Sequence, residues 1–119
     1  MGQPVVHFEV ISRDPDQLRQ FFGELFEWKF ADPMGPTDYT MVDRNTNDDG
    51  VGIAGGVGGV PEGYDGHVTF YVQVPDVGAA LEKVESLGGK RMMGPDSVPG
   101  GPTIGLFADP QGHVIGVVS

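Results

Sequence analysis

The chain has 119 residues, enough for one ordinary domain with its own core but not for two independent ones. Its formal net charge of -10 would repel phosphate backbones and anionic lipid, so we expect neither a nucleic-acid partner nor a membrane-surface partner. It has no cysteine, which excludes disulfides and thiolate zinc sites, and no apolar run near about 18 residues, so we expect a cytoplasmic protein without a membrane span.

The first predicted element is a strand over residues 5–11, where polar and apolar side chains alternate. His7 and Glu9 fall on one face of this strand, and the apolar face carries Val6, Phe8 and Val10. The alternation is typical of a strand with one buried face and one polar face.

A helix follows the strand and runs to about Phe26. Asp14 is a suitable N-cap residue, Pro15 suits the first helical position and Gln17 completes a capping box. The apolar side chains recur at helical spacing, and we expect them to form core: Leu18, Phe21, Phe22, Leu25 and Phe26.

Three short strands are predicted next, near residues 27–32, 38–44 and 51–57, separated by turns rich in Pro, Gly, Asn and Asp. The glycine-rich segment after them predicts a linker at about 59–66. Its glycines do not precede Lys and Ser or Thr at the start of a helix, so a phosphate-binding loop is not indicated.

The pattern then restarts in residues 67–74, which again alternate. Val68, Phe70, Val72 and Val74 share the apolar face, while His67, Thr69, Tyr71 and Gln73 share the polar one. Asp76 caps a second predicted helix that ends at Gly88-Gly89. Strands in "KRMM", "TIGLFA" and "HVIGVV" complete the chain.

Superposing Asp14 on Asp76 aligns the two halves, so the sequence predicts an α+β fold of tandem βαβββ modules. Module one covers about 1–58, the linker about 59–66 and module two about 67–119. Each module has one helix to cover one sheet face, which leaves the polar strand face uncovered. We expect two curled mixed sheets around a cleft lined by His7, Glu9, Thr69 and Tyr71.

These features resemble the vicinal oxygen chelate superfamily, which includes glyoxalase I, bleomycin-resistance proteins and extradiol dioxygenases. The resemblance is carried by the opening "HFEV…DP…FFGELFEW" and, most specifically, by the closing "DPQGHVIG". It covers nearly the whole chain. It implies a small-molecule ligand and a homodimer built from paired modules.

The resemblance also implies four metal-ligand positions, which fall here on His7, Ala54, Thr69 and Gly116. Only His7 is a strong donor, whereas a catalytic metal needs about three protein ligands. We therefore expect no cofactor and a degenerate metal site. An atypical site of His7, Glu9 and His67 stays open, although two residues along a strand displace a side chain by about 6.6 Å.

The leading hypothesis is a small-molecule-binding protein of glyoxalase/bleomycin-resistance type with an unidentified ligand. One alternative is a metal-dependent lyase or isomerase, or a dioxygenase, which would make the chain an enzyme. Another is a structural or regulatory dimer whose pocket is filled by side chains. His113 lies at an odd offset from Gly116, so we expect it on the surface at a turn.

Overall fold

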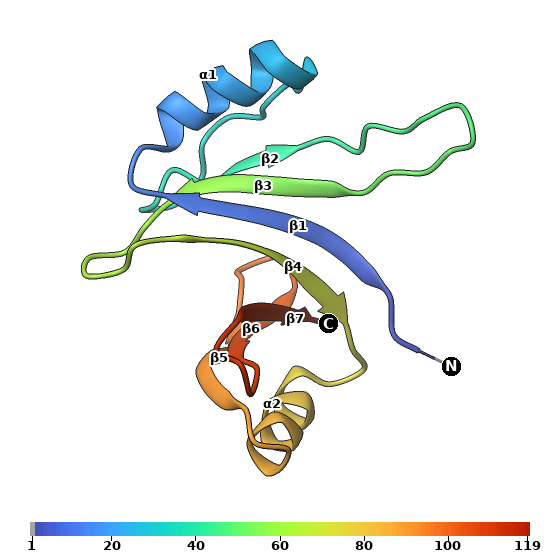
Figure 1. Ribbon diagram of the computed structural model, residues 1–119, viewed down its shortest axis with the longest axis vertical. Helices are drawn as coiled ribbons and strands as arrows, with labels where there is room; N and C mark the ends of the chain where they lie inside the picture. Colours follow the sequence, from blue (N-terminus) through green and yellow to red (C-terminus); the bar gives the residue numbers. More distant parts are fainter. Residues whose placement is uncertain (1) are drawn as a thin grey trace. The chain divides into compact units, whose positions relative to one another are not determined.

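The computed structural model describes residues 2–119, which form two helices and seven strands (Figure 1). In chain order these are β1 (Val5–Ser12), α1 (Pro15–Phe26), β2 (Thr40–Val42), β3 (Ala54–Gly59), β4 (His67–Gln73), α2 (Val77–Ser86), β5 (Lys90–Ser97), β6 (Thr103–Ala108) and β7 (Val114–Val118). The predicted α+β class and the repeat of a strand, a helix and further strands are confirmed, with three strands after α2 and two after α1. In this part of the chain, neither helix is long and apolar enough to cross a membrane.

The chain divides into two compact units. The N-terminal unit is His7–Val68, and the C-terminal unit contains residues 2–6 and Thr69–Ser119. The predicted cleft between two curled sheets stays a prediction.

In the N-terminal unit the strand order is β2-β3-β1, with β1 parallel and β2 antiparallel to β3. The strand expected at 27–32 is wrong in extent, because only Phe30 pairs, as an isolated bridge to Val42. The strand predicted at 38–44 is shorter, as β2, and the strand predicted at 51–57 begins and ends later, as β3. A polar loop connects β2 and β3. In that loop the Arg44 guanidinium donates to the carbonyl oxygens of Gly50 and Gly52.

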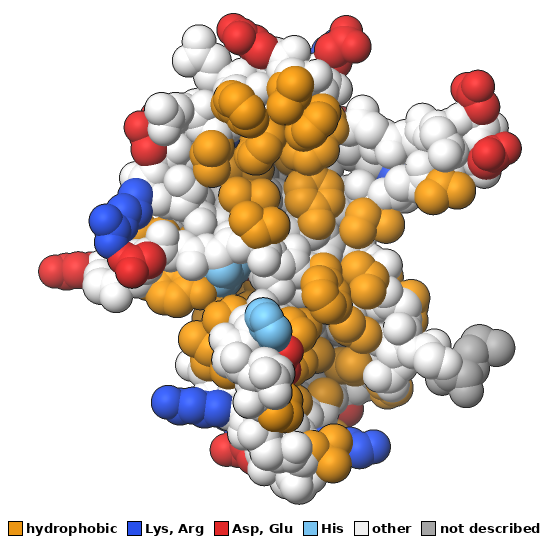
Figure 2. Space-filling view, viewed as in Figure 1, with side chains coloured by type: hydrophobic (Ala, Val, Ile, Leu, Met, Phe, Trp, Pro, Cys, Tyr) orange, Lys and Arg blue, Asp and Glu red, His pale blue; other side chains and the backbone are white. Residues whose placement is uncertain are grey.

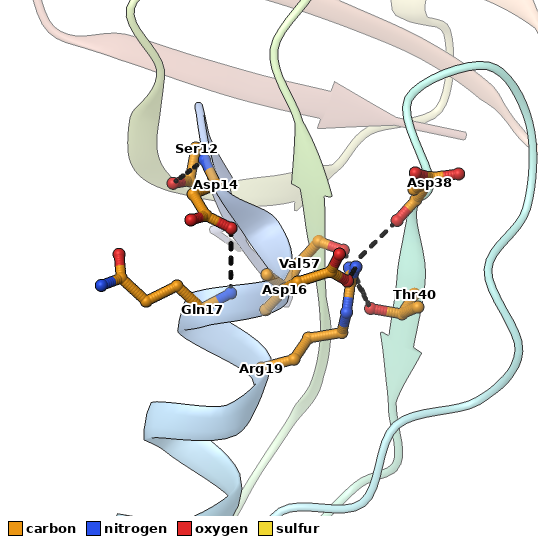
Figure 3. Close-up of polar contacts among 8 residues, drawn as sticks. All are labelled: Ser12, Asp14, Asp16, Gln17, Arg19, Asp38, Thr40 and Val57. Carbon is orange, nitrogen blue, oxygen red and sulfur yellow. Dashed lines mark hydrogen bonds and ion pairs between the residues drawn. The ribbon is translucent and has the colours of Figure 1, made fainter.

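Helix α1 begins and ends where the sequence predicts. The Asp14 carboxylate accepts from the backbone N–H of Gln17 at 3.1 Å (Figure 3). Pro15 occupies the first turn. The helix ends at Phe26, and the C-cap residue Glu27 has a left-handed φ of 60°. Arg19 ties the helix to β2 by donating to the hydroxyl oxygen of Thr40 at 3.3 Å.

The apolar stripe of α1 is only partly buried, so the expectation that all of it forms core is wrong. Leu18 and Phe22 pack against the buried cluster of Val10, Val42 and Val57. Three other apolar side chains are more than half exposed: Phe21, Leu25 and Phe26. The stripe is wider than the surface that three short strands offer, and Figure 2 shows hydrophobic side chains gathered at the surface where α1 lies.

In the C-terminal unit the strand order is β4-β7-β6-β5. Strands β4 and β7 are parallel, and the other neighbours are antiparallel. Helix α2 is capped by Asp76, whose carboxylate accepts from the N–H of Ala79 at 3.0 Å. It buries Val77 and Leu81 against Val74 and Val117.

The apolar face of β4 is not buried along its whole length. Val72 and Val74 belong to or contact the α2 core, as predicted. Val68 is 80% exposed and Phe70 40% exposed, so burial of these two is a wrong expectation. The core under α2 reaches only the end of β4 nearest the helix.

Candidate functional site

Glycines in β3 leave space for an aromatic side chain of the candidate site. The register of β1 and β3 pairs Glu9 with Gly56 and Ile11 with Gly58, so these positions share a sheet face. A Cβ atom at Gly56 would lie 2.2 Å from the Tyr39 ring, and one at Gly58 would lie 2.7 Å from it. The ring of Tyr39 therefore lies on the two glycines.

This placement brings the Tyr39 hydroxyl oxygen to 2.9 Å from Nε2 of His7. The two rings are stacked with their centroids 6.4 Å apart. On the opposite face, the ring of Phe8 lies over Gly55 and joins the core beneath α1. The polar face of β1, predicted from alternation, is thus distinct from its core face.

A buried acid and a buried base meet in the same unit. Oε2 of Glu9 lies 2.7 Å from Nε2 of His67, and the two side chains are only 8% and 9% exposed. The other ring nitrogen of His67, Nδ1, lies 2.5 Å from the hydroxyl oxygen of Tyr64. One hydrogen-bonded chain therefore joins β1, β4 and the segment that precedes β4.

Burial and charge change the proton affinities of two residues in this site. Burial lowers the pKa of His7, and the negative charge of Glu9 opposes this with a smaller effect. Burial also raises the pKa of Tyr64, and Glu9 adds to that increase. At neutral pH the site accordingly contains a neutral His7 and a protonated Tyr64.

Chemically, the polar face of the N-terminal unit offers a carboxylate, two imidazoles and two phenols. These groups can donate hydrogen bonds to a small molecule and accept hydrogen bonds from it. A carboxylate paired with an imidazole can also exchange a proton with that molecule. The structure places His7 and Glu9 on one face of β1, and their role in ligand binding stays a prediction. It also adds His67, which the sequence offered only as part of an atypical metal site.

The other two predicted site residues, Thr69 and Tyr71, belong to the C-terminal unit. The Thr69 hydroxyl donates to the carbonyl oxygen of Val114 at 2.5 Å. Tyr71 is buried, and its ring covers Gly116, where a Cβ atom would come within 2.5 Å. Both side chains have contacts within their own unit, and their role in ligand binding stays a prediction.

Sequence reasoning missed Tyr39 and Tyr64. For Tyr39 a signal existed, because an aromatic residue beside a strand of alternating glycines often lies over them. For Tyr64 there was none, since it lies in the segment read as a flexible linker and its partner is three residues away.

The metal chemistry implied by the sequence resemblance does not fit these residues. Ala54 is paired with His7 in the β1–β3 register and has no donor, and Gly116 has no side chain. The Thr69 hydroxyl is engaged with a backbone carbonyl oxygen. Within residues 2–119, no three His, Asp or Glu side chains are placed to hold a metal ion.

His113 lies at the surface turn before β7, as predicted. Its side chain is 73% exposed, and its Nδ1 is 2.9 Å from Oδ2 of Asp109. The other oxygen of that carboxylate accepts from the backbone N–H groups of Gln111 and His113. These contacts form the turn in the "DPQGH" segment.

Comparisons with known proteins agree with this fold. The sequence profile of the Glyoxalase/Bleomycin resistance protein/Dioxygenase superfamily matches residues 5–117. "Putative glyoxylase CFP32" of Mycobacterium bovis and its counterpart in Mycobacterium tuberculosis are each 30% identical over 109 residues. That match covers 89% of this chain but 41% of either relative, so the chain spans about two fifths of their length.

Solved structures give the same fold at low sequence identity. Streptomyces coelicolor methylmalonyl-CoA epimerase, in a variant bound to 2-nitronate-propionyl-CoA, has a TM-score of 0.71 at 14% identity, covering 98% of this chain and 96% of that one. A superfamily member from Vibrio splendidus has a TM-score of 0.64 at 16% identity and covers 98% of both chains. The resemblance found in the sequence is confirmed, and the chain belongs to the glyoxalase/bleomycin resistance protein/dioxygenase superfamily.

Proposed function

We propose that this chain is a small-molecule-binding protein of the superfamily, and that its ligand contacts His7 and Glu9 on the polar face of β1. The observation that carries the proposal is Glu9, whose side chain is 8% exposed and bound to His67. The core of its unit lies on the other face of the sheet, so this hydrogen-bonded acid–base pair does not belong to that core. Burying a carboxylate costs free energy even when it is paired, so its place outside the core supports a role in binding.

The surroundings of Glu9 support a ligand contact. His7 is held neutral by burial, and its Nε2 and the Tyr39 hydroxyl form a polar pair beside the carboxylate on the same strand face. Aromatic rings with a few placed polar groups are typical of small-molecule sites. The ligand itself is unidentified.

Thermal-shift screening of the purified chain against a small-molecule library tests the proposal. A ligand at about 100 times its Kd stabilises the folded state by about 2.7 kcal/mol, which is easily measured. The shift should disappear in His7→Ala and remain in His113→Ala, which removes a histidine from a surface turn. A shift of equal size in both variants would place binding elsewhere and refute the proposal.

Binding without a resident metal is part of the proposal. The alternative, a metal-dependent lyase or isomerase, needs donors that the positions of Ala54, Thr69 and Gly116 do not supply. Untagged protein should therefore contain far less than one equivalent of zinc, nickel, iron or manganese by elemental analysis. Near-stoichiometric metal that is lost in His7→Ala would favour the lyase.

Homodimerisation is also proposed, with a second copy of the chain covering exposed apolar side chains. Phe21, Leu25 and Phe26 on α1 are each more than half exposed, and closed symmetric pairing buries such a surface on both copies at once. Sedimentation equilibrium at micromolar concentration should give twice the mass of 12.6 kDa. Finding only the monomer mass would refute the dimer.

A cytoplasmic location likewise remains a proposal from the sequence.

A further inference from the structure

Both ring nitrogens of His67 are engaged by side chains from different segments. Nε2 faces the Glu9 carboxylate on β1 at 2.7 Å, and Nδ1 faces the Tyr64 hydroxyl at 2.5 Å. The rings of Tyr64 and His67 are 5.5 Å apart and nearly perpendicular. The imidazole is therefore held from both ends.

The chemistry of these groups determines where the protons lie. A carboxylate only accepts hydrogen bonds, so the proton of His67 must be on Nε2. Tyr64 keeps its own proton, because burial and the charge of Glu9 raise its pKa, and so the phenol donates to Nδ1. These two hydrogen bonds fix the orientation of the ring.

We propose that Tyr64 and His67 are positioning residues for Glu9: the phenol donates to Nδ1 and orients the His67 ring, and His67 donates from Nε2 and holds the carboxylate as an oriented acceptor for the ligand. This inference rests on the proposed function of Glu9 as a ligand contact. It adds the class of ligand, a small molecule that presents an N–H or O–H donor to that carboxylate. A contact residue fixed by further hydrogen bonds loses less freedom when it binds.

Tyr64 also connects the buried pair to the surface of its unit. An open groove there is lined by Arg13 and residues 60–65, among them Tyr64. The guanidinium of Arg13 forms an ion pair with Asp65 and so ties this segment to the region that follows β1. The segment predicted as a free linker therefore carries a residue of the site.

The inference is tested on the ligand-free full chain by nitrogen-15 NMR of the histidine rings at neutral pH. The chain contains its own control, because His113 presents the opposite nitrogen, Nδ1, to the carboxylate of Asp109. We expect His67 to show a protonated Nε2 and an unprotonated, hydrogen-bonded Nδ1. A protonated Nδ1 in His67, alone or together with Nε2, would overturn the inference.

Two variants separate the two hydrogen bonds. Tyr64→Phe removes only the hydroxyl, so the Nδ1 resonance of His67 should move to that of a nitrogen without a donor, while Nε2 stays protonated. Glu9→Gln replaces an acceptor with a group that both donates and accepts, so His67 should become a mixture of tautomers. An unchanged Nδ1 resonance in Tyr64→Phe would overturn the inference.

The binding readout uses the compounds that stabilise the chain in the thermal-shift screen. Those that contact Glu9 should carry an N–H or O–H donor, and their N- or O-methylated analogues should lose the shift. Methylated analogues that bind equally well would overturn the assigned ligand class while leaving the proposed function intact. Thermal shifts as large in His7→Ala as in His113→Ala would instead refute the proposed function itself.

Discussion

Replacing Gly56 by alanine should displace Tyr39 from β3 and break its contact with His7. The added Cβ would lie 2.2 Å from the ring and hydroxyl of Tyr39, far inside any van der Waals contact. The ring must swing away, losing its packing on the strand and the hydrogen bond to His7 of 2.9 Å. Overpacking of this kind costs about 2 kcal/mol, which lowers Tm by about 8 °C for a chain of this length.

The assay is urea and thermal unfolding of Gly56→Ala beside two controls. Gly23→Ala makes the same chemical change in α1, where the nearest atom to the new Cβ is 3.5 Å away, and should stabilise by about 0.5–1 kcal/mol. In a Tyr39→Ala background, Gly56→Ala should cost almost nothing, because the clash is gone. An equal cost with and without the Tyr39 ring would refute the reasoning.

Three further predictions concern stability. Burial lowers the pKa of His7 in the folded chain, so as pH falls below about 6.5 the unfolded chain takes up a proton at His7 before the folded chain does. The free energy of unfolding should therefore decrease as pH falls from about 6.5 through the lower pKa of the folded state. Urea unfolding of His7→Gln between about pH 8 and pH 5 should lack this part of the decrease. Asp14→Ala should cost about 1 kcal/mol in urea unfolding through loss of the α1 N-cap, and a neutral result would contradict that role. Leu81→Ala, at a fully buried side chain, should lower the free energy of unfolding by about 2–5 kcal/mol. Leu25→Ala, at a side chain 57% exposed, should lower it by well under 1 kcal/mol in the monomer. Equal losses in the two variants would contradict the assigned burial.

The parts of the fold that sequence predicted best are those determined by local chemistry. Asp14 and Asp76 cap their helices, and the alternation in β1 and β4 separates a polar face from an apolar one. These signals depend on neighbours within about four residues, which the sequence displays directly. The repeat of the two modules follows from the same local patterns.

The errors concern contacts between distant segments. Periodicity places Phe21, Leu25 and Phe26 on one stripe of α1, but it cannot tell how wide a surface the sheet offers them. The sequence predicts a strand near 51–57 but not the packing of its glycines, whereas the register of β1 and β3 places Gly56 and Gly58 beneath the ring of Tyr39. Because glycine has no side chain, the alternation of polar and apolar residues does not show which ring packs on it.

The candidate site was predicted in part. His7 and Glu9 follow from alternation, but the pairing of Glu9 with His67 joins residues 58 positions apart and depends on the fold. Tyr64 could be placed only when the path of the segment before β4 was known.

The central claim is that a small molecule binds at His7 and Glu9 without a metal ion. A crystal structure of the chain with a compound from the thermal-shift screen is the most direct test. We predict a ligand within hydrogen-bonding distance of His7 Nε2 or the Glu9 carboxylate, and no metal ion beside them. A ligand bound away from both residues, or a metal ion coordinated by His7, would contradict the account.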